Sequence, residues 1–133
     1  MEATPENRKR QMNRKLLVRS NGSLLFLNTT EILWIEAKGK YSYLHCGKNE
    51  YPVRTGIQSL EGELDPEAFI RIHRSYMVNI DSIRELKPWL KGEYRVILND
   101  GTELTWSRNY KNRFYDFVDK LALTVPARKT LRD

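Results

Sequence analysis

Short runs of apolar residues, separated by turn-forming residues, follow one another along most of the chain. Ile70 and Ile72 alternate with polar neighbours, as expected of a strand with one buried face. Asn21-Gly22 and Asn99-Asp100-Gly101 each lie between two such runs, which is typical of hairpins because these residues tolerate a positive φ. The predicted strands are residues 16–19, 24–27, 32–37, 41–46, 51–54, 68–72, 77–86, 94–98 and 102–106.

One internal segment has helical rather than strand periodicity. Ile57, Leu60 and Leu64 fall on one face of a helix, and the proline two residues later blocks its continuation. Thr55 and Gln58 have the spacing of a capping box, so we expect the helix to begin at Thr55.

A longer amphipathic pattern follows the last predicted strand, with Ser107 as its predicted N-cap. Its apolar residues are Tyr110, Phe114, Phe117, Val118 and Leu121. No internal repeat or low-complexity block is present in the sequence. The predicted fold is therefore mostly β and antiparallel, with one short internal helix and a C-terminal amphipathic helix.

The composition is that of a soluble globular domain, with 40% hydrophobic and 30% charged residues in a chain of 133. No apolar run approaches the ~20 residues that a membrane-spanning helix requires. The basic N-terminus is not followed by the apolar segment of a secretory signal. A single cysteine, Cys46, cannot form an intramolecular disulfide. These features predict a cytoplasmic protein with no membrane partner.

The net charge of +6 lies mostly at the two ends of the chain. Residues 1–15 carry +3 and residues 126–133 carry +2, which leaves +1 for the stretch between them. We therefore predict a basic flexible linker or arm at 1–15, a folded domain at 16–123 and a basic tail at 124–133. If the domain binds nucleic acid, its own charges must be segregated into a patch.

No motif points to catalysis. His45, His73 and Cys46 do not have the spacing of a zinc site, and neither a glycine-rich phosphate loop nor a G-x-S-x-G nucleophile motif is present. Glu36 and Asp81 are carboxylates that acid–base chemistry would require, but their spacing does not distinguish them from solvated residues. We predict that the chain is not an enzyme and has no cofactor or metal.

The segment FIRIHRSYMVNIDSI at residues 69–83 interrupts a strand with Arg, His, Arg and Ser within five residues. This segment resembles the signature of the LytTR DNA-binding domain family, including the R-x-H-R-S core and the V-N after it. Three further segments resemble the family in the same order, namely residues 32–41, the short helix at 55–64 and LTWSRNY at 104–110. The resemblance covers residues 16–123 in register.

The resemblance implies a transcription regulator that reads double-stranded DNA with loops between antiparallel strands, which enter successive major grooves on one face of the duplex. It also implies binding to direct repeats as a homodimer on DNA, and an upstream receiver domain or sensor kinase of a two-component system. No receiver precedes residue 16, so we expect either the effector part of a response regulator or a stand-alone regulator.

Basic and polar side chains occur in the segments that the family uses to contact DNA. Arg74 is the first candidate for a base contact, because a guanidinium can bond two guanine acceptors at once. Arg71 fits a phosphate contact and a strand-surface charge equally well, and His73 fits a hydrogen-bonded scaffold residue better than a base reader. Trp34 is expected in the core. The predicted DNA-binding residues are Lys38, Lys40, Ser42, Arg71, His73, Arg74, Ser75, Arg108, Asn109 and Lys111.

Two other functions remain open from the sequence. A single-stranded nucleic-acid-binding barrel of the OB or cold-shock type is suggested by the many short strands and the 14 aromatic residues, but the terminal helix does not fit it. A β module that binds only proteins would have no salt-dependent affinity for DNA.

Overall fold

The structure is a computed structural model that describes residues 15–126. Residues 1–14 of the predicted basic arm and residues 127–133 of the predicted tail lie outside the described residues. Within them, the strands are β1 (Lys15–Ser20), β2 (Ser23–Asn28), β3 (Trp34–Lys38), β4 (Tyr41–Cys46), β5 (Asn49–Val53), β6 (Phe69–His73), β7 (Tyr76–Asn79), β8 (Ile83–Pro88), β9 (Tyr94–Leu98) and β10 (Glu103–Trp106). The helices are α2 (Ile57–Glu63) and α3 (Lys111–Leu121), and short 3-10 turns are η1 (Thr29–Glu31), η2 (Ile80–Ser82), η3 (Leu90–Gly92) and η4 (Arg108–Tyr110).

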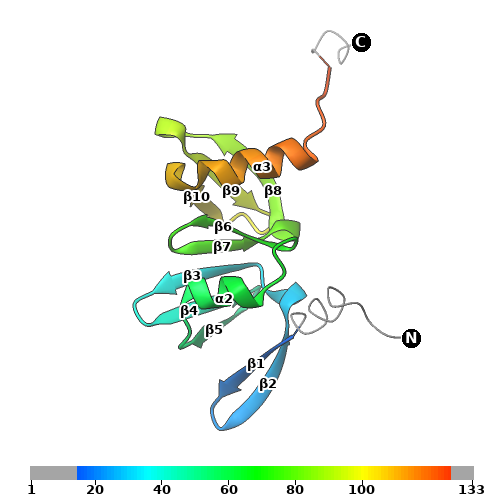
Figure 1. The fold of residues 1–133 in the computed structure, drawn as a ribbon. Coiled ribbons are helices and arrows are strands. Elements are labelled where there is room, and N and C mark those ends of the chain that lie inside the picture. Colours follow the sequence, from blue (N-terminus) through cyan, green and yellow to red (C-terminus); the bar gives the residue numbers. More distant parts are fainter. Residues whose placement is uncertain (1–14, 127–133) are drawn as a thin grey trace, which may run out of the picture.

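The strands form three antiparallel sheets stacked along the molecule (Figure 1). The hairpin of β1 and β2 stands at one end, a sheet in the order β5-β4-β3-β7-β6 lies in the middle, and a sheet in the order β10-β9-β8 lies beyond it. β5 and β6 are thus the outer strands of the central sheet, and β5 contains Pro52. The prediction of a mostly antiparallel β fold with one internal and one terminal helix is confirmed.

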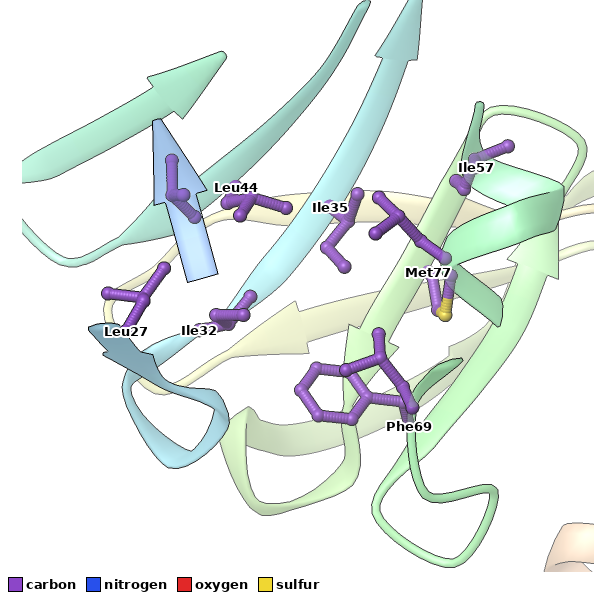
Figure 2. Packing of buried hydrophobic residues seen from close by; sticks show 10 residues of the cluster. Leu27, Ile32, Ile35, Leu44, Ile57, Phe69 and Met77 are labelled. Carbon is purple, nitrogen blue, oxygen red and sulfur yellow. The ribbon is translucent and has the colours of Figure 1, made fainter. Parts of the chain in front are cut away.

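One hydrophobic core lies between the central sheet, α2 and the β1–β2 hairpin (Figure 2). Ile35, Leu44 and Met77 project from the sheet into this core and are at most 1% exposed. The helix contributes Ile57 and Leu60 from the apolar face that the sequence predicted, and Leu64 immediately after the helix is also buried. Burial of this face, rather than intrinsic propensity, is what stabilises a helix of only seven residues.

A second core lies on the opposite face of the central sheet, against the three-stranded sheet and α3. Side chains alternate across the sheet, so Met77 lies in the first core and its neighbour Val78 in the second. Trp106 is 1% exposed and meets Phe114 of α3 edge to face, with ring centroids 5.0 Å apart. Trp34 packs against the same cluster, as predicted. The central sheet therefore contributes side chains to both cores, one on each of its faces.

Both hairpin turns have the backbone that their sequences predict. Asn21 and Gly22 have φ of 48° and 82°, and Gly101 has φ of 93°. Such values cost little for Asn and Gly, which is why this turn chemistry can be read locally. The β4–β5 turn is shorter than predicted, because β5 begins at Asn49 and pairs that residue with Cys46.

Two predictions about element boundaries are wrong. The capping box at Thr55 does not form, because the N-cap of the helix is Gly56 and no side chain caps it; Thr55 lies one residue before the N-cap. The predicted strand at 77–86 is two strands in different sheets, separated by η2. Asn79 causes the break, because its side chain accepts from the Asp81 amide at 2.9 Å and donates to the Ile32 carbonyl at 2.9 Å.

A third boundary differs in a smaller way. Ser107 is an N-cap, but it caps η4 rather than α3, since its hydroxyl accepts from the Asn109 amide at 3.2 Å. The long helix begins only at Lys111, behind the 3-10 turn. Leu121, the last residue of the predicted apolar stripe, is 59% exposed.

Candidate nucleic-acid interface

Four connections lie together along one edge of the molecule, on the left of Figure 1, and backbone contacts fix their order. The Ala37 amide donates to the Ser75 carbonyl at 2.8 Å, and the Ser107 amide donates to the Ile72 carbonyl at 2.8 Å. A Cβ on Gly92 would lie 3.2 Å from the Arg108 side chain. We call this row the loop edge; it comprises the β3–β4 turn (39–40), the β6–β7 turn (74–75), the β10–α3 connection (107–110) and the β8–β9 loop (89–93).

The β3–β4 turn presents two lysines. Gly39 has φ of 59°, a left-handed conformation that lets the chain reverse within two residues. Lys38 and Lys40 are exposed on either side of it. The ammonium of Lys38 lies 3.9 Å from Glu36 Oε1 and 5.2 Å from the centre of the Tyr43 ring, whereas Lys40 has no acidic partner within residues 15–126. Lys40 is thus the freer of the two charges.

Ser42 lies immediately after this turn but faces inward. It is 0% exposed, and its hydroxyl donates to the Thr55 carbonyl at 2.6 Å. This bond ties β4 to the connection that leads into α2. The role of Ser42 in DNA binding stays a prediction, and we leave it out of the proposed contact surface because a fully buried hydroxyl has no area to offer a ligand.

The β6–β7 turn presents Arg74 to solvent. The Ser75 amide donates to His73 Nδ1 at 3.0 Å, and the His73 ring lies 4.7 Å from that of Tyr76. The pKa of His73 is lowered from 6.5, chiefly by burial and then by the charge of Arg74. A neutral imidazole with Nδ1 as acceptor suits the scaffold role better than base reading.

Arg71 precedes the turn on β6 and is buried at 8% exposure. Its Nη1 donates to Glu61 Oε1 at 2.9 Å, and its Nε donates to the His73 carbonyl at 2.9 Å. Its Nη2 donates to the Arg74 carbonyl. This environment fits neither of the two roles predicted for Arg71, a strand-surface charge or a phosphate contact, because protein acceptors surround the guanidinium.

The β10–α3 connection adds Arg108 and Asn109, and the first residue of α3 adds Lys111; all three are exposed. Trp106 anchors this connection, because its indole Nε1 donates to the Tyr110 carbonyl at 3.0 Å. The aliphatic part of Arg108 runs along Gly92. Within residues 15–126, neither Arg108 nor Lys111 has an acidic partner within 4.0 Å.

The β8–β9 loop is part of the loop edge that the sequence reasoning missed. Trp89 and Leu90 are 50% and 67% exposed, and the Arg95 guanidinium lies 4.5 Å from the Trp89 ring centre. Lys91 has φ of 53°, which is unusual for a residue with a side chain. Trp89, Leu90 and Lys91 line a hollow of about 360 Å³ together with Arg108. The sequence signal was a pair of apolar residues, Trp89-Leu90, in a segment bounded by Pro88 and Gly92.

Other chemistry finds little support in the described part of the chain. No group of three or more His, Cys, Asp or Glu side chains in residues 15–126 is placed to hold a metal ion. Glu36 faces His45, whose Nε2 is 3.4 Å from Glu36 Oε1. Neither helix within the same residues has the length and apolar character to span a membrane. What the loop edge offers is a row of exposed positive charges on rigidly held turns.

The chain is similar in sequence to several regulatory proteins of bacteria. The chain is 29% identical over 96 residues to the sensory transduction protein LytT of Bacillus subtilis, which covers 72% of this chain and 40% of that protein. It is 32% identical over 92 residues to LytT of Oceanobacillus iheyensis, covering 68% of this chain and 37% of that protein. It is 28% identical over 102 residues to the transcriptional regulatory protein LytR of Staphylococcus aureus, covering 77% and 42%. The chain thus spans about two fifths of the length of these relatives.

The fold is also similar to a solved structure described as the LytTr DNA-binding domain of a putative methyl-accepting/DNA response regulator from Bacillus cereus. The TM-score is 0.72 at 21% identity, over 79% of this chain and 96% of that one. The OB or cold-shock alternative is not supported, because the strands form three separate sheets rather than one barrel. The family model for the LytTr DNA-binding domain matches residues 22–119, and the chain belongs to this DNA-binding family.

Proposed function

We propose that the chain binds specific sequences of double-stranded DNA and regulates transcription, with the loop edge as its reading surface. The observation that carries the proposal is the alignment of exposed basic side chains on neighbouring turns, three of which are linked by backbone hydrogen bonds. Near-neutral charge in the folded part is no obstacle, because phosphate attraction depends on how charge is distributed over the surface. The proposed contact residues are Lys38, Lys40, Arg74, Ser75, Lys91, Arg108, Asn109 and Lys111.

We divide these residues into those that contact bases and those that contact phosphates. Arg74 and Arg108 extend from turns and carry the planar donor fork that recognises guanine in the major groove, so we assign them base contacts. The lysines and Asn109 suit phosphate oxygens, which fix register without reading sequence. Turns held by β structure can present side chains in this way because the sheets supply the rigidity that a recognition helix supplies in other proteins.

The curated relatives are longer proteins with names that refer to signal transduction and transcription. We therefore propose that the domain is the effector part of a two-component response regulator, or acts alone in the same cytoplasmic role. Binding to direct repeats as a homodimer on DNA belongs to the same proposal. The match to a DNA-binding domain family supports a role without catalysis.

The test is selection of binding sites from random duplex DNA, followed by sequencing and titration of the recovered duplex. We expect a recurrent motif, a preference for the duplex over either single strand, and affinity that falls steeply with salt. Four lysines that each neutralise one phosphate would give a slope of log affinity against log salt of about −3 to −4 for each bound domain. Recovery of no motif, or equal binding to single strands, would refute the proposal, and absence of any salt-dependent DNA affinity would favour a protein-binding module.

A further inference from the structure

Arg71 forms hydrogen bonds to the backbone of the β6–β7 turn. On β6, Phe69 lies in the first core and Ile70 and Ile72 lie against the second, so alternation places Arg71 on the face that meets α2. Its guanidinium donates to the carbonyls of His73 and Arg74. These two carbonyls belong to the residues that form the turn, so the conformation of the turn depends on where this guanidinium sits.

Glu61 in turn fixes the guanidinium. One carboxylate oxygen accepts from Arg71 at 2.9 Å, and the other accepts from Arg113 of α3 at 2.6 Å. Both guanidinium groups also lie over the ring of Tyr110, at 5.9 and 5.4 Å from its centre. One carboxylate on α2 therefore connects β6 with α3, through partners that lie 10 and 52 residues away along the chain.

We propose that Arg71 is a positioning residue: held by Glu61, it fixes the β6–β7 turn so that Arg74 reaches DNA, and it does not touch DNA itself. This inference rests on the proposed function of the loop edge. Three of the five donors of Arg71 already have protein acceptors, and its side chain is 10% exposed. Only two donors remain for a phosphate, on a side chain with little exposed surface, whereas Arg74 is exposed and has no acidic partner among residues 15–126.

The deciding variant is Glu61→Gln, because the two roles of Arg71 predict opposite signs. If Arg71 positions the turn, loss of the carboxylate weakens its anchor, and affinity for the selected duplex falls about tenfold, the factor for one charge-assisted hydrogen bond. Affinity for random-sequence duplex stays unchanged. If Arg71 contacts phosphate, Glu61→Gln frees it and removes a negative charge, so both affinities rise. The matched control is Glu63→Gln, the same charge change at an exposed position of α2.

A measurement without DNA separates this inference from the proposed function. The Ser75 amide bonds to His73 Nδ1 within the turn, so its hydrogen exchange reports on turn order. We expect faster exchange of the Ser75 amide in Glu61→Gln than in wild type, with the Glu63→Gln protein unchanged. Unchanged exchange in Glu61→Gln would overturn the positioning role. If wild type selects no duplex at all, the proposed function fails, while the exchange result still decides this point.

Arg71→Lys is the second variant, for the case that Glu61→Gln does not fold. Lysine keeps the charge near Glu61 but cannot reach three acceptors from one planar group. The positioning role predicts weaker binding to the selected duplex with random duplex unaffected. A direct phosphate contact predicts that Arg71→Lys binds each duplex nearly as tightly as wild type does, since an ammonium also binds phosphate. Wild-type affinity for the selected duplex in Arg71→Lys would overturn the proposal.

Discussion

Asn79 joins two parts of the fold, and replacing it by alanine should destabilise the protein more than the same change at the exposed Asn99. Its side chain is 5% exposed and forms two hydrogen bonds, one to the carbonyl of Ile32 and one from the amide of Asp81. The first bond spans 47 residues and ends on a residue that is 0% exposed. The second forms the turn that moves the chain from the central sheet to the three-stranded sheet.

The cost can be worked out from these two bonds. Alanine leaves the buried Ile32 carbonyl without its side-chain partner, which costs about 1–3 kcal/mol. Loss of the cap on η2 adds about 1 kcal/mol. We therefore expect Asn79→Ala to lower the free energy of unfolding by about 2–4 kcal/mol, which in a domain of this size lowers Tm by about 8–20 °C.

Urea unfolding followed by far-UV circular dichroism measures this loss directly. Asn99→Ala is the matched control, because Asn99 also donates from its side-chain amide to a backbone carbonyl, that of Asp81 at 3.2 Å, but in an exposed setting. We expect the control to lose at most about 1 kcal/mol. If Asn79→Ala loses no more than Asn99→Ala, burial does not set the value of this bond and the reasoning is refuted. The m-value should not change between the variants.

Three further predictions concern the loop edge. Arg74→Ala should cost about 1–3 kcal/mol on the selected duplex and relax selectivity at one base pair; an equal loss on random duplex in a titration would instead assign Arg74 to phosphate. Arg108→Ala should remove most site-specific binding, while its free energy of unfolding stays within about 0.5 kcal/mol of wild type. Ser107→Ala should instead lower the free energy of unfolding by about 0.5–1 kcal/mol through loss of the η4 cap. Full specific affinity in Arg108→Ala would exclude this connection from DNA reading. Because the folded-state pKa of His73 is lowered, the unfolded chain binds its proton first as pH falls below about 6.5. The free energy of unfolding should therefore decrease as pH falls in that window. In His73→Gln the urea unfolding midpoint should depend less on pH between 7.5 and 5.5 than in wild type.

The features that sequence predicted best are those decided by neighbouring residues. Asn21-Gly22 specifies its turn because the required backbone is intrinsic to these two residues. Ile57 and Leu60 identify a helix face because helical spacing brings them together. The basic turns could be placed because Lys40, Arg74 and Arg108 stand next to strand ends that the pattern already predicted.

The features that were missed depend on partners far along the chain. The break at Asn79 requires the carbonyl of Ile32, and no local pattern in a run of apolar residues shows it. Thr55 could not be excluded as a cap without knowing that α2 begins two residues later, at Ile57. Arg71 resembles a DNA contact in sequence, and only the fold brings Glu61 beside it. Trp89 lies at the loop edge because Gly92 of η3 is next to the Arg108 side chain.

The two outer strands of the central sheet differ from open strand edges in ways that bear on aggregation. An open strand edge offers unpaired amides and carbonyls on which another chain can build, and this is a common route to aggregation. On β6 the Ile72 carbonyl is already taken by the Ser107 amide, and η4 and α3 pack against the strand. On β5, Pro52 removes one amide that an added strand would need. The connection that presents Arg108 thus also covers a sheet edge, so a truncation before residue 107 would leave β6 open to pairing with a strand of another chain.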